Sequence, residues 1–147
     1  MKTSLAILAL ALALAGPAAA ADYTILVWES PDDYALRTAQ TPEARAYWAA
    51  WADYAGMLTQ AGATRDGAPL GMPGEVRVFL GAETRAAPLD HDGLVLGGWF
   101  RIEAGSLEAA SALAAQAPSV ARGGAAELRT HFPAPPMTPG SAPMAAN

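Results

Sequence analysis

The sequence lacks cysteine entirely. This absence excludes disulfide bonds, thiol catalysis and cysteine-based zinc sites. Lysine is almost as scarce, because Lys2 is the only lysine and every other basic residue is arginine. The fold must therefore be stabilised by burial of apolar side chains, and a hydrophobic content of 52% with four tryptophans provides the material for one core.

Basic residues are also fewer than acidic ones. Fourteen acidic residues against nine basic ones give a formal net charge of −5, which becomes −6 when Lys2 is removed. An acidic surface repels phosphate backbones, and the sequence shows no cluster of arginines interleaved with aromatic residues. These features argue against nucleic-acid binding.

Long apolar runs are confined to the N-terminus. Lys2, the apolar residues 5–15 and the small residues 19–21 form the pattern of a secretory signal peptide, with cleavage expected before Asp22. The alternative is a membrane anchor, but about a dozen apolar residues fall short of the roughly 20 that span a bilayer. We expect a periplasmic or secreted protein without a membrane span. Its parts are a signal peptide at 1–21, one domain at 22–132 and a disordered Pro/Ala-rich tail at 133–147.

The region after the signal alternates between strand and helix patterns. Thr41 as N-cap, Pro42 at the first helical position and Gly62 as a stop predict a helix over 41–62, and Ser106 caps a second helix over 106–117. Strands are expected at 23–28, 63–70, 75–80, 94–102 and 126–132, the second and third joined as a hairpin by the turn at 71–74. This order predicts an α+β ferredoxin-like sandwich, with a mostly antiparallel sheet and two helices on one face.

One helical stripe of the first helix is rich in aromatic residues. Its members recur at spacings of three and four: Tyr47, Trp48, Trp51, Tyr54, Ala55 and Leu58. The favoured interpretation is a core face that packs against the sheet, and the alternative is an aromatic cage for a ligand.

Alternation along the strands sorts their side chains onto two faces of the sheet. The face beneath the helices is expected to carry Val76, Val78, Leu80, Leu94, Leu96, Phe100, Ile102, Leu128, Thr130 and Phe132. The opposite face is expected to carry Arg77, Phe79, Val95, Trp99, Arg101, Glu127, Arg129 and His131. The second set is too apolar to remain in water and too charged to be buried dry, so it predicts a partner surface.

Two copies packed through this second face would form a homodimer with a polar cleft between the sheets. Because arginine binds carboxylate or phosphate through paired hydrogen bonds, the three arginines favour a small anionic or polar organic ligand there. The predicted ligand-binding residues are Arg77, Trp99, Arg101, Glu127, Arg129 and His131. The alternative is that the arginines pair with neighbouring carboxylates, Glu75, Glu103 and Glu127, and only make the face soluble.

Several segments also follow one another in the order and spacing of a known family. They are residues 23–28, 47–62, 75–79, 97–103, the helix end at 117–118 and residues 126–129. On these segments the chain from Tyr23 to Phe132 resembles the YCII-related (DGPF-domain) family. Where that family carries Asp-Gly-Pro-Phe, this chain has Asp92 and Gly93 followed by Leu94 and Val95.

The resemblance implies a dimeric α/β barrel built from two ferredoxin-like chains, and it implies little about chemistry. A His–Asp pair proposed for some relatives corresponds to His91 and Asp92, with His91 as general base and Asp92 or Asp90 orienting it. One alternative for this segment is a solvated polar turn. Another is a metal site formed together with His131, but the spacing of these residues matches no recognised ligand pattern. The paired glycines Gly97 and Gly98 lie within a strand, where a bulge or close backbone approach is favoured over a phosphate loop.

Three functional hypotheses follow from the sequence. The first is an exported homodimer that binds a small molecule between its sheets. The second is a lyase or isomerase that uses His91 as general base, and the third is a non-catalytic module that binds another envelope protein. No cofactor and no metal is expected in any of them.

Overall fold

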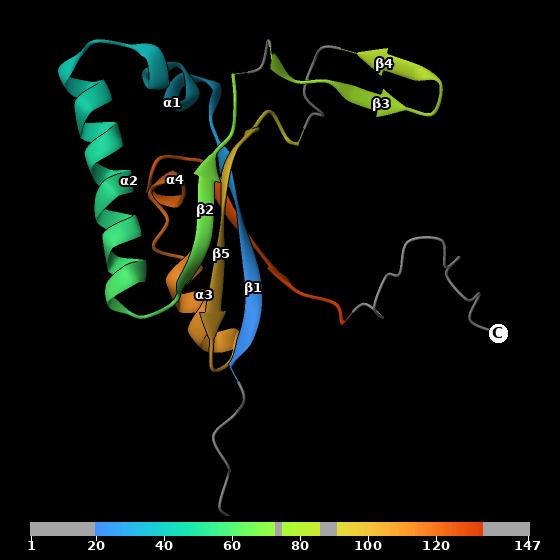
Figure 1. Ribbon diagram of the computed structural model, residues 1–147. Helices are drawn as coiled ribbons and strands as arrows, with labels where there is room; N and C mark the ends of the chain where they lie inside the picture. Colours follow the sequence, from blue (N-terminus) through green and yellow to red (C-terminus); the bar gives the residue numbers. More distant parts are fainter. Residues whose placement is uncertain (1–19, 73–74, 86–90, 134–147) are drawn as a thin grey trace, which may run out of the picture.

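The computed structural model describes residues 20–72, 75–85 and 91–133. Nearly all of the predicted signal peptide and of the Pro/Ala-rich tail lies outside these residues. Figure 1 shows one sheet with helices on a single face, and a separate two-stranded arm that projects away from it. The helices are α1 (Pro31–Ala35), α2 (Pro42–Gln60), α3 (Leu107–Ala114) and α4 (Pro118–Ala121), with a 3₁₀ turn η1 (Leu36–Thr38) after α1.

The main sheet has four antiparallel strands in the order β2-β5-β1-β6. Their bounds are Ala21–Glu29 for β1, Thr64–Pro69 for β2, Val95–Ala104 for β5 and Ala125–Thr130 for β6. The chain runs from β1 through α2 to β2, and β5 then lies between these two strands, as in a split β-α-β unit. The predicted α+β class, with a mostly antiparallel sheet covered on one face by helices, is confirmed.

The hydrophobic core lies between the sheet and the helices. Alternate residues of β1 point into it, because successive strand side chains face opposite sides. They meet residues of α2 and α3 on the other side of the same layer. The fully or nearly fully buried members include Tyr23, Ile25, Val27, Tyr54, Leu58, Ile102, Ala110 and Ala114.

The predicted helix boundaries follow their capping chemistry. The hydroxyl of Thr41 accepts a hydrogen bond from the backbone N–H of Ala44 at 3.2 Å, and Gly62, with φ of +66°, follows the end of α2. Ser106 caps α3 in the same way. α3 ends at Ala114, three residues before its predicted end, and Pro118 starts the short helix α4 instead of ending α3. Among the described residues, no helix is long and apolar enough to cross a membrane.

The hairpin predicted between residues 63–70 and 75–80 is wrong. β2 pairs instead with β5, and β3 (Val78–Leu80) pairs with β4 (Glu83–Arg85) around a two-residue turn in which Gly81 has φ of +64°. This turn and β4 lie between the strands predicted at 75–80 and 94–102, where no strand was predicted. The predicted strand at 75–80 is therefore part of the arm, which comprises residues 75–85, and not of the main sheet. Val76, Val78 and Leu80 do not lie beneath the helices, and Arg77 and Phe79 do not lie on the open face of the main sheet.

A β-bulge reverses the side-chain directions that alternation predicts for one end of β5. The register against β1 shifts between Val27 and Trp28, so Leu96 pairs with Trp28 and Val95 pairs with the buried Glu29. Directly paired residues share a face of the sheet. The predicted faces of Leu96 and Val95 are thus exchanged, because an inserted residue reverses the alternation beyond it.

The last strand is shorter than predicted. β6 ends at Thr130, and Phe132 is exposed beyond it instead of lying under the helices. The backbone N–H of His131 still bonds the carbonyl oxygen of Asp22 at 3.3 Å. Phe132 therefore adds nothing to the core.

Candidate functional site

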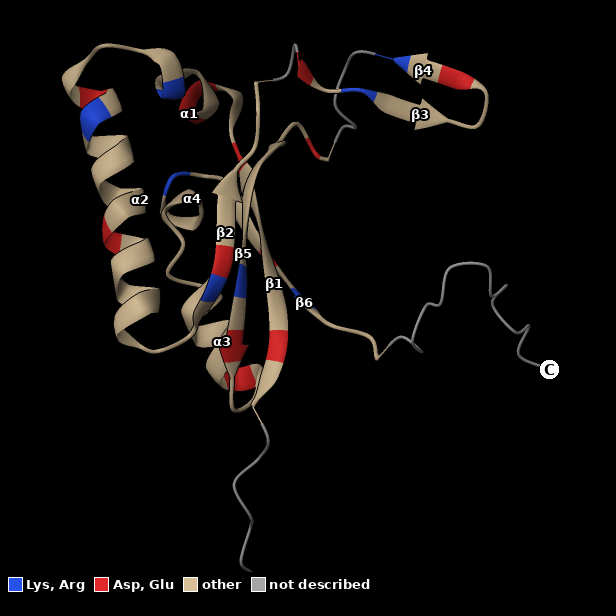
Figure 2. Cartoon of the chain, viewed as in Figure 1, with Lys and Arg blue, Asp and Glu red and all other residues tan. Residues whose placement is uncertain are grey.

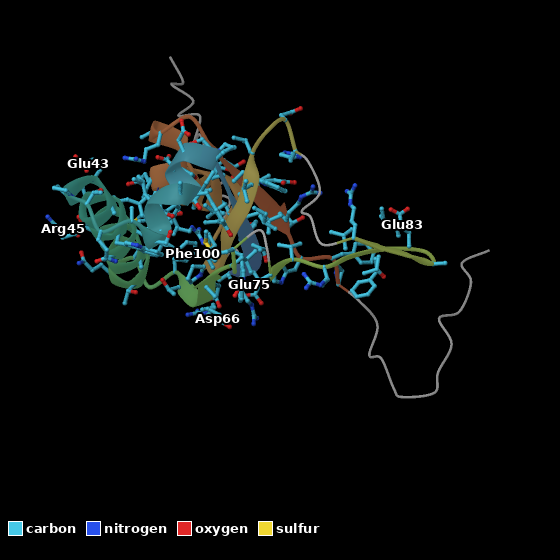
Figure 3. All side chains as sticks on the ribbon, turned by 90° about the horizontal axis from the view of Figure 1, so that it is seen from above. Glu43, Arg45, Asp66, Glu75, Glu83 and Phe100 are labelled. Atoms are coloured by element: carbon cyan, nitrogen blue, oxygen red, sulfur yellow. The ribbon has the colours of Figure 1, made fainter. Side chains whose placement is uncertain are left out.

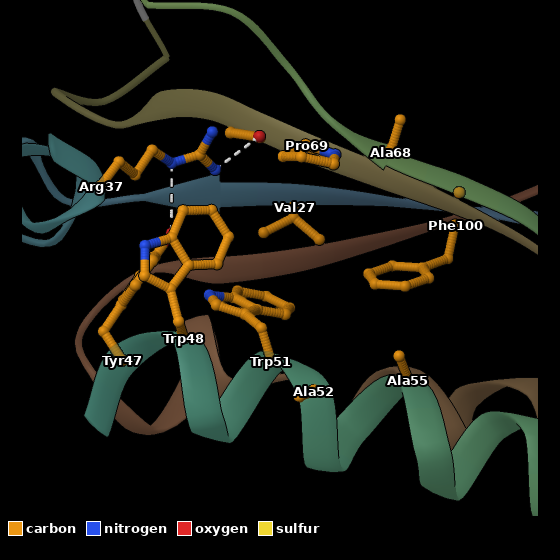
Figure 4. A pocket seen from close by; sticks show the side chains of 13 residues that line it. Val27, Arg37, Tyr47, Trp48, Trp51, Ala52, Ala55, Ala68, Pro69 and Phe100 are labelled. Carbon is orange, nitrogen blue, oxygen red and sulfur yellow. Dashed lines mark hydrogen bonds between the residues drawn. The ribbon is translucent and has the colours of Figure 1, made fainter. Parts of the chain in front are cut away.

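A cavity of about 340 Å³ lies between α2 and the β2–β5 edge of the sheet. Figure 4 shows it with Arg37 at one end, Phe100 at the other and the alanines of α2 along one wall. We call it the α2 cavity. It is lined by Val27, Arg37, Tyr47, Trp48, Trp51, Ala52, Ala55, Gly67, Ala68, Pro69, Gly97, Gly98 and Phe100.

Small side chains leave this space open where a helix faces a sheet. Ala52 and Ala55 occupy the α2 side, and the paired glycines of β5 occupy the opposite side. Large rings frame the remaining volume, since Trp51 and Phe100 lie nearly parallel with ring centroids 6.2 Å apart. The arrangement leaves a slot with aromatic walls, which suits a flat ligand.

The aromatic stripe of α2 divides between core and cavity. Tyr54 and Leu58 are buried in the core, as the favoured interpretation predicted. Trp48, which is 41% exposed, and Ala55 line the cavity, and Trp51 both lines the cavity and packs against the core. The core interpretation is therefore confirmed for Tyr54 and Leu58, and the ligand cage stays a prediction for the residues that line the cavity.

The charged end of the cavity is a buried network of three side chains. Glu29 accepts a hydrogen bond from the Tyr47 hydroxyl at 2.6 Å and one from Nη2 of Arg37 at 2.5 Å. The Nε of Arg37 also donates to the Tyr47 hydroxyl at 3.1 Å. The Glu29 side chain is 1% exposed and that of Arg37 is 8% exposed, so the ion pair is almost completely removed from water.

Arg37 also fastens this end of the sheet through backbone carbonyls. Its guanidinium donates to the carbonyl oxygen of Leu70 at 2.9 Å and to that of Gly97 at 2.6 Å. The same group lies 4.4 Å from the ring centroid of Tyr34. Arg37 thus joins η1 to the end of β2 and to the bulge of β5, which holds the cavity wall in place.

The paired glycines confirm the interpretation of a bulge with close backbone approach. A Cβ on Gly97 would overlap the Oε2 of Glu29 and lie 2.7 Å from Nη2 of Arg37. A Cβ on Gly98 would lie 3.1 Å from the carbonyl oxygen of Ala68. Gly97 is therefore what allows the ion pair to sit against the sheet.

The network is arranged for binding and support. Burial raises the pKa of Tyr47, and its hydrogen bond to Glu29 raises it further, so the phenol stays protonated at neutral pH. Both carboxylate oxygens of Glu29 already accept hydrogen bonds. Arg37 and Tyr47 thus hold the Glu29 carboxylate in a fixed position at the end of the cavity.

The open face of the sheet carries most of the residues predicted to bind a ligand. On β5, Trp99 pairs with Leu26 of β1 and Arg101 pairs with Thr24 of β1. On β6, Arg129 pairs with Thr24 from the other side. Because directly paired residues share a face, these side chains all lie on the open face. Glu127 pairs with Leu26, and the ring of His131 lies 2.8 Å from the hydroxyl of Thr24. The structure therefore brings together five of the six predicted residues: Trp99, Arg101, Glu127, Arg129 and His131. The sixth, Arg77, lies in the arm.

The arginines of this face have carboxylate partners. Arg101 pairs with Asp22 at 2.7 Å, and the Nε of Arg129 donates to Glu127 at 2.6 Å. Figure 2 shows acidic and basic residues next to each other on β1, β2 and β5. The alternative of charge-paired arginines is confirmed for Arg129 with its predicted partner Glu127, whereas Arg101 uses Asp22, which the sequence analysis did not name.

His91 and Asp92 lie in a tight turn at the start of β5. Asp92 and Gly93 have φ of +53° and +76°, and His91 bridges to Leu94, which is the geometry of a two-residue Asp-Gly turn. The imidazole of His91 stacks on Trp28 with centroids 4.2 Å apart, and Trp28 Nε1 donates to Glu127 at 3.0 Å. The catalytic pair stays a prediction, and Asp90 lies outside the described residues.

Sequence reasoning missed the charged end of the α2 cavity. Glu29 and Arg37 lie between the strand predicted at 23–28 and the helix predicted at 41–62, where no further element was predicted, but the structure forms α1 and η1 there. A signal was present, since Glu29 continues the alternation of Tyr23, Ile25 and Val27 on the buried side of β1. A carboxylate at such a position needs a buried cation, and Arg37 is the first arginine that follows.

In the described part of the chain, no group of three or more His, Asp or Glu side chains is placed to hold a metal ion. No protein-family model and no curated protein matches the chain.

Proposed function

We propose that this protein binds a small, planar and largely apolar molecule in the α2 cavity. The observation that carries the proposal is a volume of about 340 Å³ with aromatic walls and a polar end. Ligand pockets usually start near 300 Å³ and are mostly apolar, with a few fixed polar groups. This volume suits a molecule of one or two fused rings.

The electrostatics of the cavity favour a neutral ligand. Arg37 is the only cation among its lining residues, and Glu29 already neutralises it at 2.5 Å. An anion placed there would face the carboxylate as well as the guanidinium, and it would lose its hydration. The small anionic ligand expected from the open-face arginines therefore does not suit this cavity.

A matched pair of probes tests the proposal. We expect the neutral 2-naphthol to bind at least ten times more tightly than the anionic 2-naphthoate, as measured by isothermal titration calorimetry. Ala52→Leu, which fills the cavity from α2, should weaken naphthol binding at least tenfold. Ala49→Leu is the control, because Ala49 is an exposed residue of the same helix outside the lining.

Two results would overturn this proposal. One is the absence of saturable naphthol binding, and the other is equal affinity in the Ala52→Leu and parent proteins. If naphthoate binds more tightly, and Arg101→Ala or Arg129→Ala removes that binding, the ligand site lies on the open face.

A second candidate function concerns the open face itself. Leu26 and Trp28 on β1 and Trp99 on the adjacent strand β5 are partly exposed there. We propose that two copies pack these faces together as a homodimer, the arrangement that the resemblance to YCII-related proteins implies. A small anionic or polar molecule held between the sheets would then contact Arg101, Arg129 and His131.

The homodimer has its own test. Sedimentation velocity at micromolar concentration should give the mass of two chains, and Trp99→Asp should shift it to that of one chain, because a carboxylate would be buried against the partner. A single-chain mass for the parent protein would contradict this candidate and leave the α2 cavity proposal unaffected.

A further inference from the structure

The arm exposes large apolar side chains far from the core. Phe79 on β3 is 73% exposed and Leu80 is 46% exposed. Figure 3 shows Glu83 well out on the arm, at a distance from the body of the molecule that holds Phe100. A two-stranded hairpin is marginally stable in water unless its side chains pack against something else. The arm thus has the features of an element that needs a partner.

A second apolar hollow lies at the root of the arm. Its volume is about 360 Å³, and it is distinct from the α2 cavity, since the two share no lining residue. Most of its lining is apolar or aromatic: Trp28, Tyr34, Leu70, Val78, Val95 and Leu96. An aromatic ring is the natural occupant of such a space.

We infer that the arm of one copy docks on a second copy of the chain, with Phe79 inserted into the hollow at the root of the partner's arm. The inference rests on the homodimer proposed above and names the element that joins its two chains. Phe79 does not fill the hollow of its own chain, because it is 73% exposed there. A two-fold axis makes the contact reciprocal, so each dimer gains two such insertions.

The position and charges of the arm agree with this partner. In Figure 1 the arm extends on the side of the sheet that the helices leave uncovered, so a second copy on the open face would lie within its reach. Arg77 and Arg85 flank the exposed apolar pair of the arm, and Glu75 lines the hollow. Opposite charges would thus meet at the rim when the arm docks.

The test compares two serine variants by sedimentation equilibrium. Phe79→Ser should raise the dimer dissociation constant at least tenfold. Leu107→Ser, which truncates a half-exposed leucine on α3, should leave it unchanged. Circular dichroism spectra that match the parent's would show that both variants are folded.

Engineered cysteines give a second readout, because the natural chain has none to interfere. Phe79→Cys in one chain and Leu96→Cys in another, differently tagged chain should form a mixed disulfide between chains on oxidation. Each variant oxidised alone should give less of the linked species. A parent dimer that Phe79→Ser does not weaken, together with no mixed disulfide, would overturn the arm contact alone, whereas a monomeric parent would overturn the homodimer as well.

Discussion

The two faces of the sheet use the same ion-pair chemistry in opposite environments. On the helix side, Glu29 and Arg37 form one pair that is almost fully buried and shares Tyr47 and two backbone carbonyls. On the open side, Asp22–Arg101 and Glu127–Arg129 are pairs whose arginines remain substantially exposed. The ion pairs on the two faces have similar N–O distances, and they differ mainly in how far their side chains are exposed to water.

Burial decides what each pair contributes. An exposed pair is screened by water and contributes about 0–1 kcal/mol to the free energy of unfolding. A buried pair has lost its hydration, so removing one partner leaves an uncompensated charge. The helix side should thus respond strongly to mutation and the open side weakly.

Breaking the buried pair should have the largest effect. Arg37→Ala would leave the Glu29 carboxylate buried without its cation and should reduce the free energy of unfolding by about 3–5 kcal/mol. Urea denaturation followed by circular dichroism measures this loss. Arg101→Ala, on the open face, should leave the free energy of unfolding nearly unchanged, because water screens the exposed Asp22–Arg101 pair. Equal losses in the two variants would show that the environments do not differ as described.

A smaller effect is expected from a methyl group placed against the same pair. Gly97→Ala would push a Cβ into Glu29 and Arg37, and such overpacking costs about 1–3 kcal/mol. Gly56→Ala in α2 is the matched control, because no atom lies within 4 Å of its added Cβ. That variant should be stabilised by about 0.5–1 kcal/mol, since alanine favours helix. Unchanged stability in Gly97→Ala would mean that the bulge relaxes freely.

The fold was predictable where local chemistry and pattern agree. Thr41, Pro42 and Gly62 mark the ends of α2, and alternation placed Trp99, Arg101 and Arg129 on one face. The prediction was wrong where a partner far along the chain decides the pairing. β2 pairs with β5 although the arm lies between them in the sequence. A six-residue strand that contains glycine and proline carries little information about its pairing partner.

The candidate site was less predictable because it depends on three separate segments. The α2 cavity exists because Ala52, Ala55 and Gly97 are small at positions that meet only after folding. Its polar end joins Glu29, Arg37 and Tyr47, and hydropathy patterns cannot report a contact between a strand end, a 3₁₀ turn and a helix. The bulge also shifts the register of β5 against β1, which exchanges the faces of the sheet on which Val95 and Leu96 lie.

The smallest expected effect comes from acid on the open face. The hydrogen bond from Trp28 Nε1 holds the pKa of Glu127 below its ordinary value of 4.5, and Arg129 adds to this shift. A lowered pKa means that the contribution is present above the ordinary value and is lost as pH falls through the folded-state pKa. Between pH 6 and pH 3, the parent should therefore lose more stability than Glu127→Gln, by less than about 1 kcal/mol because the pair is partly exposed. Urea unfolding at the two pH values measures the difference, and an equal loss in both proteins would mean that the Trp28–Glu127 contact does not contribute in solution.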